Sequence, residues 1–282
     1  GSRAKSKTAG VNHEGGLPVY FFDKDTSRSD TLNFSFYEAK KQLIRKYTTH
    51  PDEKKKEGQL KVKPGSNVFY WDLTYPSAEK VEGMILWWAS LSGPTALPGK
   101  YAVVLESRKE KIEQYFNLLK DPRNKSTEQE LQQQFDFLVE VRDKMTETHL
   151  ALKNITKAKE QISVLEGSIE DKVKYKDLLT EAERVKKEMT EIENKLYQTK
   201  NKSGQDPLNY PIRLNNKLGH LNSLTSMGDY KPTDQAVAFK NEVIRDIDAE
   251  LNKLYKIFKT DIPALNQKVK ENEIDLIRLN KN

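Results

Sequence analysis

The sequence predicts an α+β protein with two domains: an immunoglobulin-like or fibronectin-like β-sandwich at residues 17–122, and an antiparallel, up-down helical bundle of about four helices at residues 123–282. Hydrophobic residues alternate with a period of two in the first part and recur at three- and four-residue spacing in the second. The length of 282 residues also allows two domains. Residues 1–16 have neither pattern and begin with Gly1-Ser2, which is typical of a cloning scar, so we expect a disordered tag or linker there.

Short runs rich in β-branched and aromatic residues predict the strands of the first part. They lie at 17–22, 31–39, 42–49, 58–63, 66–75, 100–107 and 111–119. About seven strands in about a hundred residues are typical of a sandwich. Trp71, Trp87 and Trp88 all fall in this part, and we expect them to fill its core or a domain interface. The alternative for Trp87 or Trp88 is an exposed platform on which a sugar ring stacks.

The second part begins with a clear helix start. Pro122 ends the last strand, and Thr127 followed by Glu130 has the pattern of a capping box. Hydrophobic stripes then predict a first helix up to Gly167-Ser168, a second with its stripe at 178–196, a third from about 211 to 227, and a fourth from about 237 to 280 with a bend at Pro263. The stripes are wide and lack a sustained heptad seam, so they favour a bundle over a two-stranded rod.

The composition argues against several classes of function. The net charge is +6, but part of the excess lies in the first ten residues, and elsewhere Lys and Glu alternate as on solvated helix faces. We therefore expect no nucleic-acid partner. The chain has no cysteine, which excludes disulfides, thiolate zinc sites and cysteine nucleophiles. The longest apolar run, at 84–91, is too short to cross a bilayer, so we expect no membrane insertion, and we expect a monomer.

No motif for catalysis stands out. The four histidines, His13, His50, His149 and His220, lie in a tail, a loop and two different helices, and no pair has the spacing of a metal site. Carboxylates are abundant, so a glycosidase-like pair can be imagined, but the sequence singles out no two of them. We expect no catalytic, cofactor-binding or metal-binding residue.

The stretch 206–221 carries more polar residues than a helix corner needs. Its candidate binding residues are Asn209, Tyr210, Arg213, Asn215 and Asn216. We expect them to form a polar latch with the backbone of a neighbouring loop such as 228–235. A ligand site is the alternative.

Two segments resemble known families. Residues 62–76, "VKPGSNVFYWDLTYP", and 92–107, "SGPTALPGKYAVVLES", resemble bacterial Ig-like domains related to that of the flagellar hook-capping protein. Residues 205–243, with "YPIRLNNKL" and "GDYKPTDQ", resemble the C-terminal region of bacterial sortilin-like or BNR-repeat "glycosyl hydrolase" proteins. The resemblance spans roughly residues 17–270. Where relatives have a glycine in a strand hairpin, this chain has Lys40-Lys41, so the strand register there is open.

This resemblance implies a non-catalytic structural or interaction module, without the N-terminal β-propeller that carries the family's hydrolase label. The implied partner is that propeller, or an envelope protein or glycan. The implied location is bacterial and exported: periplasmic, outer-membrane-associated or secreted. Two alternatives stay open. One is a glycoside hydrolase or its accessory carbohydrate-binding portion, and the other is a spectrin-like spacer or adhesion module.

Overall fold

The computed structural model describes residues 8, 10, 15–24, 30–52 and 57–274, which form an α+β chain of two compact units. The β unit comprises Gly1–Pro76 and Pro94–Lys125, and the helical unit comprises Ser77–Gly93 and Ser126–Asn282. The sequence-based boundary at 122/123 kept residues 77–93 in the sandwich. The structure assigns them to the helical unit, because their hydrogen bonds and apolar contacts are made there.

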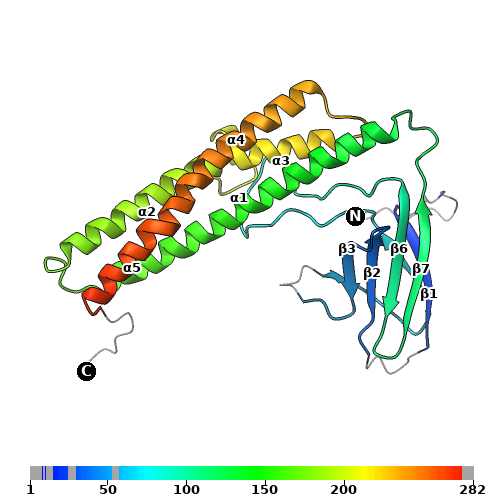
Figure 1. Ribbon diagram of the computed structural model, residues 1–282, viewed down its shortest axis with the longest axis horizontal. Coiled ribbons are helices and arrows are strands. Elements are labelled where there is room, and N and C mark those ends of the chain that lie inside the picture. The colour runs from blue at the N-terminus through cyan, green and yellow to red at the C-terminus, as the bar shows by residue number, and fades with distance from the viewer. Residues whose placement is uncertain (1–7, 9, 11–14, 25–29, 53–56, 275–282) are drawn as a thin grey trace. The chain divides into compact units, whose positions relative to one another are not determined.

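Strands form at all seven predicted positions of the β unit, although β4 covers only two residues of the predicted 58–63 (Figure 1). Their bounds are β1 Leu17–Asp23, β2 Asn33–Glu38, β3 Leu43–Thr48, β4 Gly58–Gln59, β5 Gly65–Trp71, β6 Gly99–Glu106 and β7 Lys111–Leu118. One sheet has the order β1-β5, and the other has the order β4-β3-β2-β6-β7. All pairs are antiparallel except β3 with β4.

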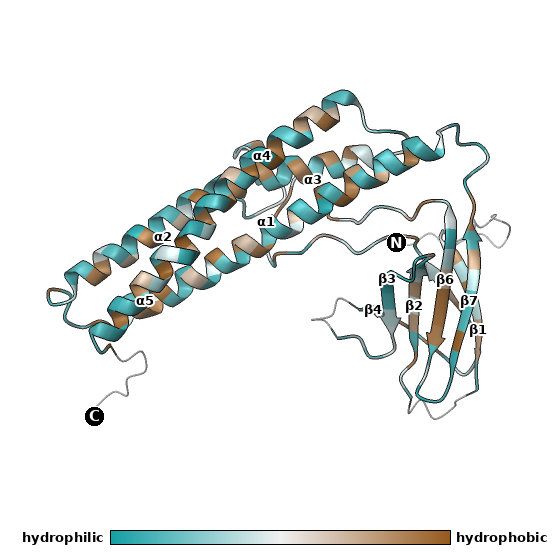
Figure 2. Ribbon diagram, in the orientation of Figure 1, coloured by the Kyte–Doolittle hydropathy of each residue, from teal (hydrophilic) through white to brown (hydrophobic). Residues whose placement is uncertain are grey.

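Aromatic rings from both sheets meet in the core of the β unit. Trp71 of β5 is fully buried, and its ring lies 4.4 Å from that of Phe36 on β2. Phe34 stacks on Phe69 in the same way, with 5.6 Å between ring centroids. Figure 2 shows that β6, which also contributes to this core, is strongly hydrophobic. The prediction that Trp71 fills this core is confirmed, whereas Trp87 and Trp88 lie in the helical unit and not in this core.

The β2–β3 hairpin contains Lys40-Lys41, for which the sequence comparison left the strand register open. Lys41 has φ of 62°, in the left-handed region, and its N–H donates to the Glu38 carbonyl at 2.8 Å. The register between the strands shifts at Phe36/Tyr37. A lysine therefore occupies a turn conformation that favours glycine, because its Cβ crowds the backbone there.

Lys41→Gly is expected to stabilise the β unit by about 0.5–1 kcal/mol, since glycine removes the steric cost of the positive φ. Urea denaturation of the two proteins measures this difference. The matched control is Lys40→Gly, at a neighbouring position without a positive φ, which should be neutral or destabilising. Equal effects of the two substitutions would contradict the assignment of strain to Lys41.

The helical unit contains five α-helices among its described residues (Figure 1). They are α1 Glu128–Ser168, α2 Lys176–Leu196, α3 Leu214–Thr225, α4 Asp234–Lys256 and α5 Ile262–Glu271. The predicted capping box at Thr127 and Glu130 is confirmed. Helix α1 contacts α2, α3 and α4, and α2 contacts α4 and α5. Helix α2 covers the whole predicted stripe at 178–196, whereas α3 has 12 residues and is shorter than the expected 211–227.

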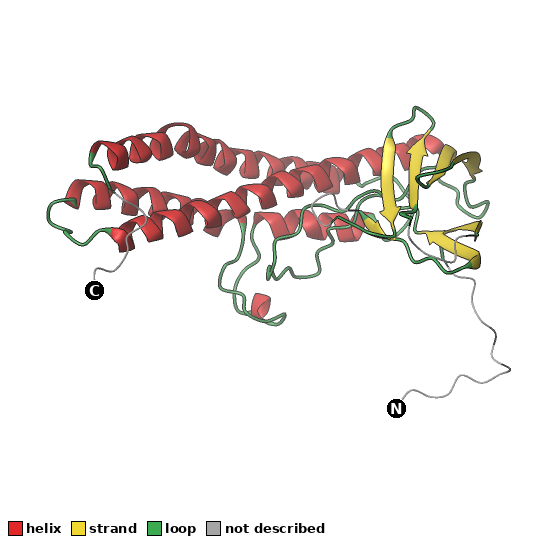
Figure 3. Cartoon of the chain, turned by 90° about the horizontal axis from the view of Figure 1, so that it is seen from below, coloured by secondary structure: helices red, strands yellow, loops and turns green. Residues whose placement is uncertain are grey.

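The predicted bend near Pro263 is present as a π-helical turn, η3 Ile257–Asp261, between α4 and α5. Proline has no N–H to donate to the preceding turn, and a wider turn absorbs the lost bond. Helix α5 ends at Glu271 and residues 272–274 are not helical, so the expected continuation to about residue 280 is not found in the described part, and residues 275–280 lie outside it. Between α2 and α3 the chain makes a loop that carries the short 3-10 helix η2, Asp206–Leu208, seen at the loop tip in Figure 3. In the described part of the chain, every helix is too short or too polar to cross a membrane.

Candidate functional site

The most distinctive feature of the helical unit is an irregular segment, residues 77–93, which we call the strap. It closes on itself through Ala78, whose N–H donates to the Leu91 carbonyl at 2.7 Å. Met84, Leu86 and Leu91 pack on the hydrophobic core of the helices. An irregular backbone cannot satisfy its own polar groups, so side chains or water must do so. In the strap, side chains of the helices supply many of these partners.

Two asparagines of α3, Asn216 and Asn222, provide most of these bonds. Asn216 binds Trp87 twice: its Oδ1 accepts from the Trp87 N–H at 2.6 Å, and its Nδ2 donates to the Trp87 carbonyl at 2.9 Å. Asn222 Nδ2 donates to the carbonyls of Ser90 and Ser92, at 3.0 and 2.9 Å. Asn215 and Asn216 are buried, as is Asn222. These amides therefore fix the strap backbone on both sides of residues 88 and 89.

A glycine of α3 lets the strap approach the helix closely. The Gly219 carbonyl accepts from the Ser90 N–H at 3.0 Å. A Cβ at Gly219 would lie 2.9 Å from the Ala89 Cβ and 2.9 Å from the Met145 Cε, closer than side-chain carbons pack. Glycine is unfavourable inside a helix, so its presence here is explained by this contact.

The first half of the strap is held by α1 through a buried histidine. His149 Nδ1 donates to the Glu79 carbonyl at 2.6 Å, and its Nε2 accepts from Asn215 Nδ2 at 3.2 Å. Burial lowers the pKa of His149, and this outweighs the Glu79 carbonyl, which raises it. The imidazole is therefore neutral at neutral pH, with its proton on Nδ1. The Asn215 Oδ1 is buried and has no hydrogen-bond partner among the described residues.

The strap displays one tryptophan to solvent. Trp88 is 72% exposed, and its ring lies 6.5 Å from that of Trp87 in a stacked arrangement. Its φ is 48°, in the left-handed region that large side chains rarely adopt. Such a conformation costs about 1–3 kcal/mol and persists only where the surroundings enforce it. The bonds to Trp87 and Ser90 enforce it here, so the strap holds the Trp88 indole outward against an intrinsic backbone preference.

The structure brings together four of the seven sequence-predicted binding residues: Asn215, Asn216, Trp87 and Trp88. The latch prediction named the wrong loop, since these asparagines bind the strap and not residues 228–235. The start of that loop is bound instead by Gln134 of α1, whose Nε2 donates to the carbonyls of Thr225 and Gly228. The prediction failed because the face of α3 that carries the asparagines lies against the strap.

The other three predicted residues, Asn209, Tyr210 and Arg213, lie apart from the strap contacts. Asn209 ends η2, and Lys200 Nζ lies 5.7 Å from the centre of the Tyr210 ring. Arg213 is exposed at the start of α3 and forms no side-chain hydrogen bond that would cap the helix. Asp206 and Pro207 start η2, as the sequence predicted.

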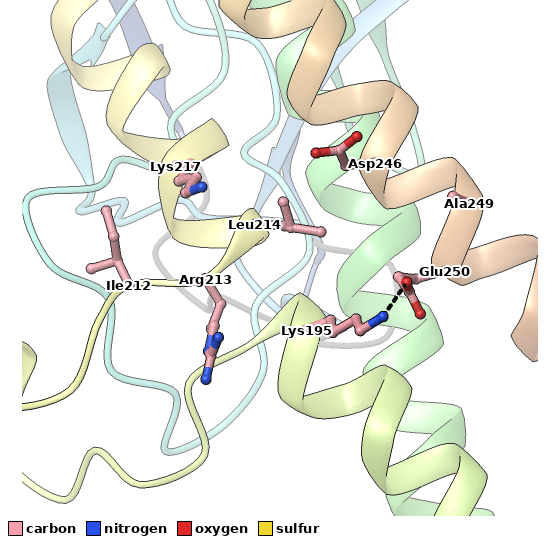
Figure 4. A pocket seen from close by; sticks show the side chains of 8 residues that line it. All are labelled: Lys195, Ile212, Arg213, Leu214, Lys217, Asp246, Ala249 and Glu250. Atoms are coloured by element: carbon pink, nitrogen blue, oxygen red, sulfur yellow. Dashed lines mark hydrogen bonds and ion pairs between the residues drawn. The ribbon is translucent and has the colours of Figure 1, made fainter.

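Arg213 instead lines a pocket of about 350 Å³ between α2, α3 and α4 (Figure 4). Lys195 forms an ion pair with Glu250 at 3.1 Å, and Lys253 forms another at 2.8 Å. Although burial raises the pKa of Glu250, the hydrogen bonds from Lys253 and Lys195 outweigh it and lower the pKa. In Figure 4, Arg213 extends away from Asp246 and Glu250. The negative charge of the buried Glu250 is thus already balanced by two lysines, and its ion pair with Lys195 connects α2 to α4.

Two residues of the strap site were missed from the sequence. Gly219 and Asn222 follow Asn215 and Asn216 along α3 at helical spacing, and an isolated glycine inside a predicted helix is a signal of close backbone approach. Across the described ranges, no three His, Asp or Glu side chains gather in a way that could hold a metal ion. Comparisons with protein-family models, curated proteins and solved structures give no match.

Proposed function

We propose that this chain is a non-catalytic interaction module, the C-terminal part of an exported, sortilin-like β-propeller protein. In this proposal the β unit is an Ig-like sandwich and the helical unit is an antiparallel up-down bundle. The strap is the surface that docks on a protein partner, and the first partner to consider is the propeller itself.

The observation that carries the proposal is the enforced exposure of Trp88. Removing a tryptophan from water is favourable, and tryptophan is enriched among the residues that dominate binding energies at interfaces. Here three asparagines, a glycine and a histidine are used to hold one irregular segment. These contacts give the exposed Trp88 indole a fixed position, and a fixed contact residue loses less conformational entropy when it binds.

The proposal predicts that Trp88→Ala weakens binding of the chain to the separately expressed propeller of its parent protein by at least about tenfold, because the indole supplies the central apolar contact. Biolayer interferometry with immobilised propeller measures this effect. Tyr115→Ala is the matched control, since Tyr115 is an aromatic residue of the β unit with 64% exposure. It should bind like the unaltered chain.

Two results would contradict this function. One is the absence of propeller binding at micromolar concentrations, and the other is equal binding by the Trp88→Ala and Tyr115→Ala variants. Titration with neutral oligosaccharides, followed by tryptophan fluorescence, tests the carbohydrate-binding alternative. Quenching that disappears in Trp88→Ala would favour that alternative over a protein partner.

A further inference from the structure

The β unit contains a large cavity that is independent of the strap. Its volume is about 980 Å³, within the range of sites that bind small molecules. Residues of both sheets line it at one end of the unit. The apolar lining includes Phe21 of β1, Leu105 of β6, and Leu32, Leu60 and Val62 from the segments that precede β2 and follow β4.

The cavity has a simple origin in the sheet topology. One sheet has five strands and the other has only β1 and β5, so the smaller sheet cannot cover the whole inner face of the larger one. Phe21, Leu32 and Leu105 are half-buried as a result, although they belong to the core cluster. Apolar surface left open in this way gains about 25 cal/mol per Å² when a ligand covers it.

Several polar groups at the cavity are already used to hold the ends of the strands. Asp30 accepts from the N–H groups of Thr31 and Arg108, at 2.8 and 3.1 Å. Thr49 Oγ1 accepts from the Leu32 N–H at 3.2 Å. Ser107 Oγ accepts from two N–H groups of the β6–β7 turn. These groups have little capacity left to bind a ligand.

The lysines of the cavity differ, because they are free to bind. Lys24, Lys61 and Lys109 line it, and no described residue forms an ion pair with any of them. Three carboxylates also line the cavity. Asp23 and Asp30 take part in other interactions, so only the Glu110 carboxylate lacks a partner among the described residues. Among the described lining residues, the charge without an ion-pair partner is therefore predominantly positive.

We propose that this cavity binds a fatty acid, with the alkyl tail between the two sheets and the carboxylate at Lys61 and Lys109. The tail covers the apolar lining that the two-stranded sheet leaves open. The carboxylate supplies the counter-charge that the lysines lack. This site does not depend on the strap or on a propeller partner.

Isothermal titration with saturated fatty acids of eight to fourteen carbons, each below its micelle concentration, tests the site. Each added methylene should tighten binding by up to about fourfold, the factor that corresponds to about 0.8 kcal/mol, until the tail fills the cavity. Dodecanoate should bind more tightly than dodecanol. The double substitution Lys61→Glu/Lys109→Glu should remove most of that difference while leaving dodecanol binding unchanged.

A substitution that fills the cavity provides the second test. Val62→Trp should weaken dodecanoate binding at least about tenfold, because the indole takes the space of the tail. Val68→Trp, at a β5 valine outside the lining, is the matched control and should bind normally. Thermal unfolding of both variants checks that the β unit remains folded. Affinity that does not depend on chain length, or equal binding by the two tryptophan variants, would overturn the site. Equal affinity for dodecanol and dodecanoate would overturn the role of the lysines.

Discussion

Replacing Asn216 by alanine is expected to lower the free energy of unfolding of the helical unit by about 2–4 kcal/mol. The side chain is buried, and it satisfies both the N–H and the carbonyl of Trp87. Alanine leaves two backbone groups without partners, and each buried, unsatisfied group costs about 1–3 kcal/mol. Urea denaturation measures the loss. Hydrogen exchange locates it, since the Trp87 amide should lose its protection.

The matched control is Asn209→Ala. Asn209 comes from the same polar stretch, but its side chain is exposed and makes no hydrogen bond with the described residues. Its replacement should change stability by less than about 0.5 kcal/mol. If Asn216→Ala costs no more than this control, or if the Trp87 amide stays protected, the Asn216 side chain is not what holds the strap. Asn216→Ala should also weaken binding of the proposed partner, because Trp88 would lose its fixed position.

The elements with a strong repeat in the sequence were predictable. The alternation of Val68 with Phe69 and Trp71 on β5 and the three- and four-residue spacing along α1 each depend on one face of a regular element, and both periods appear in the local sequence. Thr127 and Glu130 were predictable for the same reason, since a capping box is completed within four residues. Lys41 shows the limit of such rules, because its left-handed conformation is imposed by the hairpin and not by its own preference.

The strap was not predictable, because its structure is decided by residues far along the chain. Its run of apolar residues and its two tryptophans fit a sandwich core as well as they fit a helical partner. What decides between the two is Asn216 and Asn222, each about 130 positions away. The sequence did single out Asn215 and Asn216 as excess polarity, but it could not identify what they bind, since an amide side chain accepts many partners.

The second large effect concerns pH. The stability of the helical unit is expected to fall as the pH drops below about 6.5, the ordinary pKa of histidine, because burial lowers the pKa of His149 in the folded state. Between the folded and unfolded pKa values the unfolded chain binds the proton and the folded chain does not, so acid favours unfolding. The slope from this one group approaches about 1.4 kcal/mol per pH unit.

The contacts around the ring explain why protonation is unfavourable. A proton on Nε2 would point at the Asn215 amide donor, and Asn215 would have to turn over and give up its contact with Met84 Sδ, 3.3 Å away. The other charges nearby are Glu79 and Lys153, which form an ion pair at 2.5 Å. Lys153 further disfavours the imidazolium, whereas Glu79 favours it.

Unfolding free energies measured from pH 8 to pH 5 test this expectation in the unaltered chain and in two variants. His149→Gln should be less stable at pH 8 and should lose the part of the pH slope that begins near 6.5. His220→Gln, on α3 and outside the strap contacts, should keep that slope. If the unaltered chain and His149→Gln show parallel pH profiles, His149 is not the titrating group. The His149 ring binds Glu79, which is part of the strap, so protonation of His149 should release the strap before the helices unfold. Hydrogen exchange at pH 5.5 would detect this release as faster exchange at residues 79–87 than in α1.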